Sequence, residues 1–234
     1  MKNSDYIEKI KTYSHFVVAV DGPSSAGKST VAKRIAEITN IDYIDTGAMY
    51  RAIALKIIRE KINVPDDANE TVTDQLMTML DATEVDIQSG LILLDGVDVS
   101  EFIRTPEVTM MASKSSALPI IREKLVALQR QMGDKKSVIM DGRDIGSNVF
   151  PNADYKFYIT ASSEIRANRR YKEMLEKGME TTYEEVFADI EKRDYDDSHR
   201  ALNPLCKTED AIELCTDNMD IEDVVSKVLE KIAE

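Results

Sequence analysis

The residues most suited to chemistry form a glycine-rich loop, Gly22-Pro23-Ser24-Ser25-Ala26-Gly27-Lys28-Ser29, which is followed by Thr30. Its spacing, G-x-x-x-x-G-K-[ST], is that of a phosphate-binding loop, in which backbone N–H groups face phosphate oxygens. Lys28 can contact the β and γ oxygens of a triphosphate, and the hydroxyl of Ser29 can bind Mg²⁺. The loop therefore predicts a binding site for a nucleoside triphosphate.

The segments on either side of the loop support this interpretation. The apolar run 16–21 predicts a buried strand before the loop, and residues 29–38 carry apolar side chains at helical spacing after it. The N-terminus of that helix would face the bound anion. A chance match to the motif in a glycine-rich turn would lack this strand and this helix.

Arginines are the second group of residues that could take part in binding or catalysis. A guanidinium matches phosphate oxygens with two parallel hydrogen bonds, and phosphoryl transfer depends largely on positioning and charge neutralisation. Five arginines fall on two strongly charged predicted helices: Arg166, Arg169 and Arg170 at i, i+3 and i+4 on the first, and Arg193 and Arg200 at i and i+7 on and after the second.

These two helices, residues 162–178 and 183–199, are expected to form an exposed hairpin with a glycine-containing bend. Such a hairpin could close over bound phosphates and exclude water. The alternative is a solvated helix pair in which glutamates on the same helices neutralise the arginines.

The remaining elements predict an α/β fold of three layers, in which helices cover both faces of a five-stranded parallel sheet. The expected strands are residues 16–21, 41–45, 137–141, 155–159 and 211–215. A small antiparallel insert interrupts this alternation, with strands expected at 84–88, 91–95 and 97–99.

Composition narrows the function classes. The 234 residues are 43% hydrophobic and 31% charged, which is typical of a globular protein. A net charge of −13 argues against a nucleic-acid polymer as partner, because such binding requires many basic side chains. No run approaches the ~20 apolar residues of a membrane helix, and the N-terminus lacks the apolar segment of a signal peptide. We expect a cytoplasmic protein and, without an apolar heptad, a monomer.

A phosphate-binding loop alone fits a kinase, a motor ATPase or a GTP-dependent switch. The sequence contains neither Asp-x-x-Gly nor Asn-Lys-x-Asp, so it lacks the usual sensors of a Ras-like switch. The chain is also short for a helicase or motor. A small kinase, of the adenylate or shikimate kinase kind for example, and a nucleotide-binding regulator without transfer activity stay open at this point.

Four further motifs carry a resemblance to a known family: Asp-Thr-Gly-Ala-Met-Tyr-Arg at 45–51, Asp-Gly-Val-Asp-Val-Ser at 95–100, Ile-Arg-Thr at 103–105 and Asp-Gly-Arg-Asp-Ile-Gly at 141–146. With the loop, and in this order, they closely resemble bacterial cytidylate kinases, which are nucleoside monophosphate kinases. The likeness covers about residues 16–232. It implies reversible transfer of the γ-phosphoryl group of ATP to CMP or dCMP with Mg²⁺.

The resemblance also implies a domain organisation, in which residues 1–14 form an N-terminal extension and 15–234 a single kinase domain. Its expected parts are a core (15–45, 134–161 and 201–234), a monophosphate-binding region (46–133, with an insert at about 63–103) and a lid (162–200).

Several acceptor-site residues follow from the resemblance. Arg51 and Arg143 are expected to bind the acceptor phosphate, and Thr46 to lie near the acceptor nucleotide. The positions that read cytosine in the family are Ser113, Arg122 and Asp144. Their chemistry agrees, because a carboxylate accepts the N4 amino group while guanidinium and hydroxyl groups can donate to N3 and O2.

The resemblance implies further roles on the lid helices. Arg193 and Asp197 are expected to contact sugar and phosphate, although an ion pair between these two residues is an alternative role for Asp197. Arg166, Arg170 and Arg200 are expected to meet the donor phosphates or the moving phosphoryl group. The expected catalytic set is Lys28, Arg143, Arg166, Arg170 and Arg193.

Two carboxylates at strand ends, Asp21 and Asp141, have two possible roles. They can hold Mg²⁺ through water, next to Ser29 as the direct ligand, or they can cap the turn that follows each strand.

Overall fold

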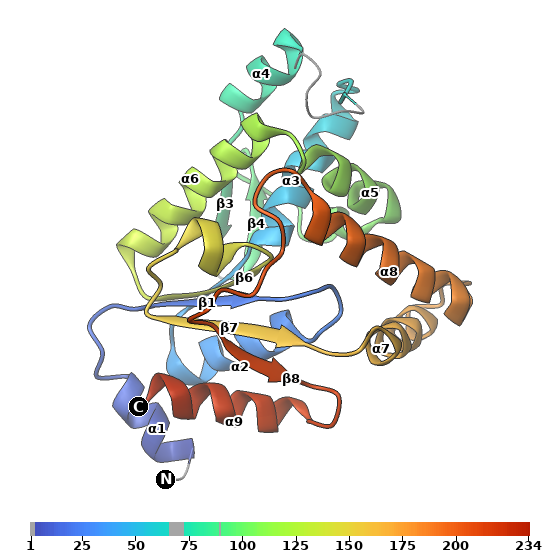
Figure 1. Ribbon diagram of the computed structural model, residues 1–234. Helices are drawn as coiled ribbons and strands as arrows, with labels where there is room; N and C mark the ends of the chain where they lie inside the picture. Colours follow the sequence, from blue (N-terminus) through green and yellow to red (C-terminus); the bar gives the residue numbers. More distant parts are fainter. Residues whose placement is uncertain (1–2, 66–72, 89) are drawn as a thin grey trace. The chain divides into compact units, whose positions relative to one another are not determined.

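The computed structural model describes residues 3–65, 73–88 and 90–234, and it divides into two compact units. The first comprises Met1–Tyr43 and Lys135–Glu234, and the second Ile44–Asp134. Figure 1 gives the element labels for both units. Parts of the expected insert, residues 66–72 and 89, lie outside the described residues.

A five-stranded sheet forms the centre of the first unit, in the order β2-β6-β1-β7-β8. Its strands are β1 (Val17–Asp21), β2 (Asp42–Asp45, at the boundary of the units), β6 (Val138–Gly142), β7 (Tyr155–Thr160) and β8 (Ile212–Cys215). β1 pairs in parallel with β6 and β7, and β7 pairs in parallel with β8. This confirms the predicted fold class.

Some helices of the first unit cover this sheet, and two others, α7 (Ser163–Glu176) and α8 (Tyr183–His199), form the expected lid, which is called the lid hairpin below. The unit also contains α1 (Asn3–Ile10), α2 (Lys28–Thr39) and α9 (Ile221–Ile232), together with a short π-helical turn at Ile145–Val149. α1, α2 and α9 lie on the same side of the sheet (Figure 1). There α2 and α9 bury apolar side chains against β1, β6, β7 and β8 in one continuous core.

The apolar spacing of α9 explains why it packs on the sheet. Val224, Val225, Val228, Leu229 and Ile232 share one face and are all buried. The helix begins with a capping box, in which Asp220 accepts from the N–H of Asp223 and the side chain of Asp223 accepts in return.

The lid hairpin has a small core of its own. Ala167 of α7 packs against Val186 and Ile190 of α8, with partly buried aromatic side chains around them. A second capping box, formed by Thr182 and Glu185, begins α8. The expected bounds of 162–178 and 183–199 differ from these helices by at most two residues, within the usual uncertainty of helix ends.

The second unit joins helices to a small antiparallel sheet. Its elements are α3 (Thr46–Arg59), α4 (Asp74–Asp81), β3 (Val85–Gln88), β4 (Leu91–Leu94), β5 (Val97–Asp98), a 3₁₀ turn at Phe102–Arg104, α5 (Pro106–Ser115) and α6 (Pro119–Lys135). The sheet order is β3-β4-β5, with both pairs antiparallel, as the sequence predicts.

None of the helices within 3–65, 73–88 and 90–234 combines the length and the apolar character that a membrane span requires.

Candidate active site

The phosphate-binding loop lies between β1 and α2, as its motif requires. Gly22 has a φ of 147° and Gly27 a φ of 92°, both in the region that favours glycine. A Cβ atom on Gly22 would lie 2.0 Å from the carbonyl oxygen of Ile159, so only glycine fits there. No side chain caps the start of α2 at Gly27, which leaves the first N–H groups of that helix available to an anion.

Lys28 is buried within this loop and donates from Nζ to the carbonyl oxygen of Pro23 at 2.6 Å. Burial lowers the pKa of Lys28 below its ordinary value, and the positive charge of Arg143 lowers it further. Asp141, Asp197 and Asp21 act in the opposite direction. A bound phosphate would add negative charge at this position and favour the protonated lysine.

Ser29 and Asp141 form a cluster of oxygen atoms beside the loop. The hydroxyl of Ser29 donates to Oδ2 of Asp141 at 2.7 Å, and the hydroxyl of Tyr43 donates to Oδ1 at 2.8 Å. Mg²⁺ prefers oxygen ligands and is usually held by one or two protein groups, substrate phosphates and water. The residues present fit such an ion. The described part of the chain contains no cluster of three or more metal-ligating side chains.

Asp21 does not cap the turn after its own strand, β1, because its carboxylate binds the turn that follows β6 instead. Its Oδ1 accepts from the backbone N–H of Ile145 at 2.8 Å, and its Oδ2 accepts from that of Gly146 at 2.7 Å. These bonds anchor the π-helical turn that follows Arg143 and Asp144. Because burial outweighs the two N–H groups, the pKa of Asp21 rises from 3.8 to about 6.

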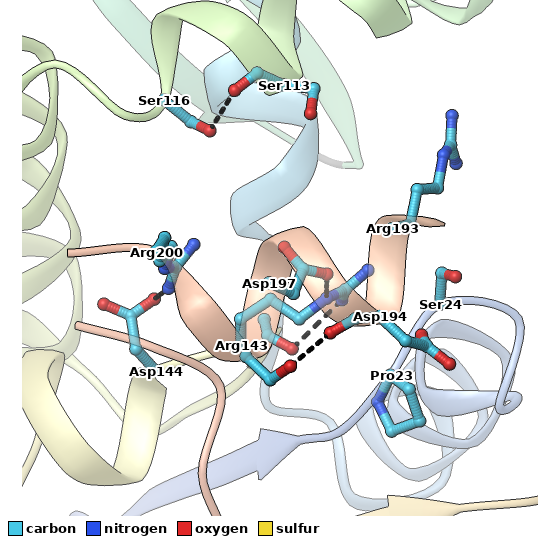
Figure 2. A network of polar contacts seen from close by, with 12 residues as sticks. Pro23, Ser24, Ser113, Ser116, Arg143, Asp144, Arg193, Asp194, Asp197 and Arg200 are labelled. Atoms are coloured by element: carbon cyan, nitrogen blue, oxygen red, sulfur yellow. Dashed lines mark hydrogen bonds and ion pairs between the residues drawn. The ribbon is translucent and has the colours of Figure 1, made fainter. Parts of the chain in front are cut away.

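Arg143 and Asp197 form the central ion pair of the first unit, shown in Figure 2. Nε of Arg143 donates to Oδ2 of Asp197 at 2.6 Å, and Nη1 donates to the carbonyl oxygen of Gly142 at 3.2 Å. Burial disfavours the charge of Arg143, but Asp197 and two further aspartates together raise its pKa. The alternative pairing of Asp197 with Arg193 is wrong, since Arg193 pairs with Asp189 at 3.2 Å.

Asp144 and Arg200 form a second pair in the same unit (Figure 2). Nη2 of Arg200 donates to Oδ1 of Asp144 at 3.0 Å, and Asn148 donates to Oδ2 at 3.0 Å. Arg200 also donates from Nε to the carbonyl oxygen of Asn203 at 2.7 Å. The expected base-reading carboxylate is thus 6% exposed and held from two sides.

The arginines of α7 point in different directions despite their helical spacing. Arg166 is buried and pairs with Asp194 of α8. Arg169 donates to the side chain and carbonyl of Thr216, at 3.0 and 2.8 Å. Arg170 lies at the surface and pairs with Glu173 at 3.0 Å. The expectation that Arg166 faces the donor phosphates disagrees with this geometry, because Asp194, which sequence spacing does not reveal, binds its guanidinium.

Asp45 forms ion pairs with two arginines of the second unit, Arg51 and Arg104. Its side chain accepts from the N–H of Ala48 at 2.8 Å, which caps α3 next to Thr46. Nη2 of Arg51 lies 3.3 Å from Oδ2 of Asp45, and Nη2 of Arg104 lies 3.5 Å from the same atom. One carboxylate therefore holds the expected phosphate ligand Arg51.

Arg122 is also fixed inside the second unit. Its Nη1 donates to the carbonyl oxygen of Ser116 at 3.3 Å, and its guanidinium lies 5.6 Å from the ring centroid of Tyr50. Ser113 lies near the end of α5 with an exposed side chain, and its carbonyl oxygen accepts from the hydroxyl of Ser116 at 2.9 Å.

The expected site residues thus fall into two sets. Thr46, Arg51, Ser113 and Arg122 belong to the second unit, and the others belong to the first. Sequence reasoning missed Asp45 and Asp194 as arginine partners. The sequence does indicate a structural role for Asp45, because this residue precedes a helix as its N-cap. For Asp194 the sequence shows only that it lies in an acidic helix.

A parallel α/β sheet with a phosphate-binding loop after β1 and an arginine-bearing helical hairpin defines a phosphate-loop kinase of the nucleoside monophosphate kinase type. The family model for cytidylate kinase matches residues 18–234. The chain therefore belongs to the cytidylate kinase family.

Curated relatives agree with this assignment. The chain is 46% identical over 218 residues to a protein named cytidylate kinase from Clostridioides difficile strain 630, an alignment that covers 93% of this chain and 98% of the relative. It is also 46% identical to the cytidylate kinase of Desulforamulus reducens, covering 92% and 96% of the two chains.

Among solved structures, an uncharacterised protein from Eubacterium ventriosum matches with a TM-score of 0.52 and 12% identity. The match covers 93% of this chain and 98% of that one. At this identity the likeness supports the fold alone.

Proposed function

We propose that this chain transfers the γ-phosphoryl group of ATP reversibly to CMP and dCMP. The observation that carries the proposal is the neighbourhood of Lys28 and Arg143. The lysine belongs to the donor loop and the arginine is an expected ligand of the acceptor phosphate. The charge of Arg143 nevertheless lowers the pKa of Lys28, and the same three aspartates raise the pKa of both residues. Family membership supports the same reaction.

Ion pairs hold the two arginines that are proposed to bind the acceptor phosphate. Asp197 holds Arg143 at 2.6 Å and Asp45 holds Arg51 at 3.3 Å. A phosphate, like a carboxylate, presents two oxygen acceptors that a guanidinium can bind with two parallel hydrogen bonds. The acceptor phosphate would therefore exchange with these carboxylates, and no general base is needed because the phosphate is already an anionic nucleophile.

Base recognition is assigned to Asp144, Arg122 and Ser113. The carboxylate of Asp144 would accept the N4 amino group of cytosine, while Arg122 and Ser113 would donate to N3 and O2. Uracil would place a carbonyl oxygen against Asp144 and leave two acceptors facing each other, a costly arrangement in a buried site.

Mg²⁺ is the proposed metal, with the Ser29 hydroxyl as its ligand and Asp141 beside it. Bound there, the ion would neutralise charge on the donor phosphates. The half-buried arginines Arg170 and Arg193 are proposed to add positive charge from the lid helices. Arg193 and Asp197 are proposed to contact the acceptor nucleotide.

A coupled assay of ADP release across CMP, dCMP, UMP, AMP and shikimate tests the proposal. We expect turnover with CMP and dCMP well above that with the other acceptors. Absence of activity above background with both cytidine nucleotides would reject it. Arg143→Ala, which removes the acceptor-phosphate ligand, should lower kcat or CMP affinity by about 10²-fold or more, by analogy with transition-state arginines. A nucleotide-binding regulator would show neither effect.

We further propose that the protein acts as a cytoplasmic monomer. Sedimentation at micromolar concentration should give a mass near the 26.3 kDa of one chain. A concentration-independent mass of twice that value would reject the monomer.

A further inference from the structure

Arg166 is a buried guanidinium with every N–H directed at a protein acceptor. Nε donates to the carbonyl oxygen of Ala161 at 2.9 Å. Nη1 donates to the carbonyl oxygen of Ser24 at 3.2 Å and to Oδ1 of Asp194 at 3.0 Å. Nη2 donates to Oγ of Ser163 at 3.0 Å and to Oδ2 of Asp194 at 2.5 Å. A guanidinium has five N–H donors, so this arrangement uses all of them.

These bonds join three separate segments of the first unit. Arg166 stands in the first turn of α7, Ser24 lies in the middle of the phosphate-binding loop, and Asp194 belongs to α8. The small apolar core between α7 and α8 holds the two helices together but includes no residue of the loop. The guanidinium of Arg166 connects the hairpin to the middle of the loop through the carbonyl oxygen of Ser24.

The burial of Arg166 argues against a role as a mobile phosphate ligand. Its side chain is 4% exposed, compared with 36% for Arg170 and 35% for Arg193. To reach a phosphate it would have to give up a bidentate pair with Asp194, and the carboxylate would lose its partner. Separating a buried pair in this way is strongly unfavourable.

We infer that Arg166 and Asp194 are positioning residues, which together fix the lid hairpin to the phosphate-binding loop through the carbonyl oxygen of Ser24. The pair sets the conformation in which the loop receives the donor phosphates, while Arg170 and Arg193 supply the mobile positive charge. Arginine is required at this position, since a lysine has a single donor group and cannot hold Ser24 and both oxygens of Asp194 together.

The inference rests on the proposed use of ATP but not on the identity of the acceptor. Two measurements on the full-length protein therefore test it: binding of ATP, and hydrogen exchange of the loop amides between residues 22 and 28. Both can be read even if the acceptor panel rejects CMP.

The variants form a double-mutant cycle of Arg166→Gln, Asp194→Asn and the combination. If the two residues act as a pair, each single change should weaken ATP binding about tenfold, raise loop exchange rates, and raise KM for ATP more than KM for CMP. The combined variant should be no worse than either single one. Asp196→Asn is the matched control, because it removes the same charge from an exposed position of α8 and should leave both readouts unchanged.

A role for Arg166 as a phosphate ligand gives different results. Arg166→Gln would then lower kcat by several hundredfold, whereas Asp194→Asn would free the arginine and preserve or improve turnover. Either that asymmetry, or unchanged loop exchange in Asp194→Asn, would overturn the inference.

Arg166→Lys covers the case in which Arg166→Gln does not fold. We expect the lysine variant to share the loss of ATP binding and the faster loop exchange of Asp194→Asn, since it keeps the charge but not the geometry. Recovery of near wild-type ATP binding with lysine would show that charge alone suffices, and would equally overturn the inference.

Discussion

At the scale of single residues, Asp144 determines the choice of base under the proposed function. In Asp144→Asn the amide could turn its NH₂ group toward the carbonyl of uracil, and it would lose the full charge that pairs with Arg200. We predict that the ratio of kcat/KM for CMP to that for UMP falls about tenfold or more, as expected for one exchanged buried polar contact. Steady-state kinetics with both acceptors measures it.

The KM for ATP provides the control for this variant and should change little, because the carboxylate of Asp144 binds Arg200 and Asn148, which lie outside the phosphate-binding loop. An unchanged CMP-to-UMP ratio would show that another residue reads the base.

Asp21 makes a second residue-scale prediction, which concerns pH. Its pKa rises from 3.8 in the unfolded chain to about 6 in the fold, so the folded state binds more protons between these values. The contribution of Asp21 to the free energy of unfolding is therefore fully present below about pH 4 and is lost as the pH rises through 6. Comparison with Asp21→Asn, which does not titrate, isolates the effect.

We predict that the difference in unfolding free energy between the wild-type protein and Asp21→Asn shifts by about 1 kcal/mol in favour of the wild type between pH 7 and pH 5. Urea denaturation at both values measures it. A constant difference across this range would show that Asp21 keeps an ordinary pKa.

At the scale of elements, α5 depends on its first turn. The hydroxyl of Thr105 accepts from the N–H of Val108 at 3.2 Å, and Pro106 occupies the first helical position. Thr105→Ala should lower the unfolding free energy by about 1 kcal/mol, whereas Thr105→Ser keeps the hydroxyl and should cost much less. Chemical denaturation of both variants provides the comparison, and equal losses would assign the effect to the lost methyl group instead of the cap.

Elements were also where sequence reasoning was most reliable. The five strands follow from short apolar runs, and the lid helices follow from charged segments separated by a glycine-containing bend, which are all local properties of the sequence. The turn at Ile145–Val149 could not be predicted this way, because the carboxylate of Asp21, more than a hundred positions earlier, anchors it. The carboxylates that pair with the arginines could not be predicted for the same reason. Spacing gives the face of a helix on which a residue lies but not the residue that packs against it, as the pairs of Arg166 with Asp194 and Arg143 with Asp197 show.

At the scale of the whole molecule, the first and last helices of the chain pack against each other in the first unit. α1 packs against α9, with the hydroxyl of Tyr13 donating to the carbonyl oxygen of Ile232 at 3.1 Å and Asn3 donating to Ser226 at 2.7 Å. α1 and α9 lie on the same side of the sheet in Figure 1. Residues 3–14 of the N-terminal extension, which the family resemblance leaves out, thus pack against this unit, with Ile10 in its core.

The last prediction tests that role through Ile10, which is 1% exposed and belongs to the same apolar core as α2 and α9. Ile10→Ala should lower the unfolding free energy by about 2–4 kcal/mol, the cost of a cavity at a buried aliphatic side chain. Glu8→Ala, at an exposed position of the same helix, should change it by less than about 0.5 kcal/mol. Urea denaturation separates the two, and KM for ATP should stay unchanged in both because α1 carries none of the residues that are proposed to bind nucleotide. A small effect of Ile10→Ala would mean that α1 docks without contributing to the stability of the sheet beneath it.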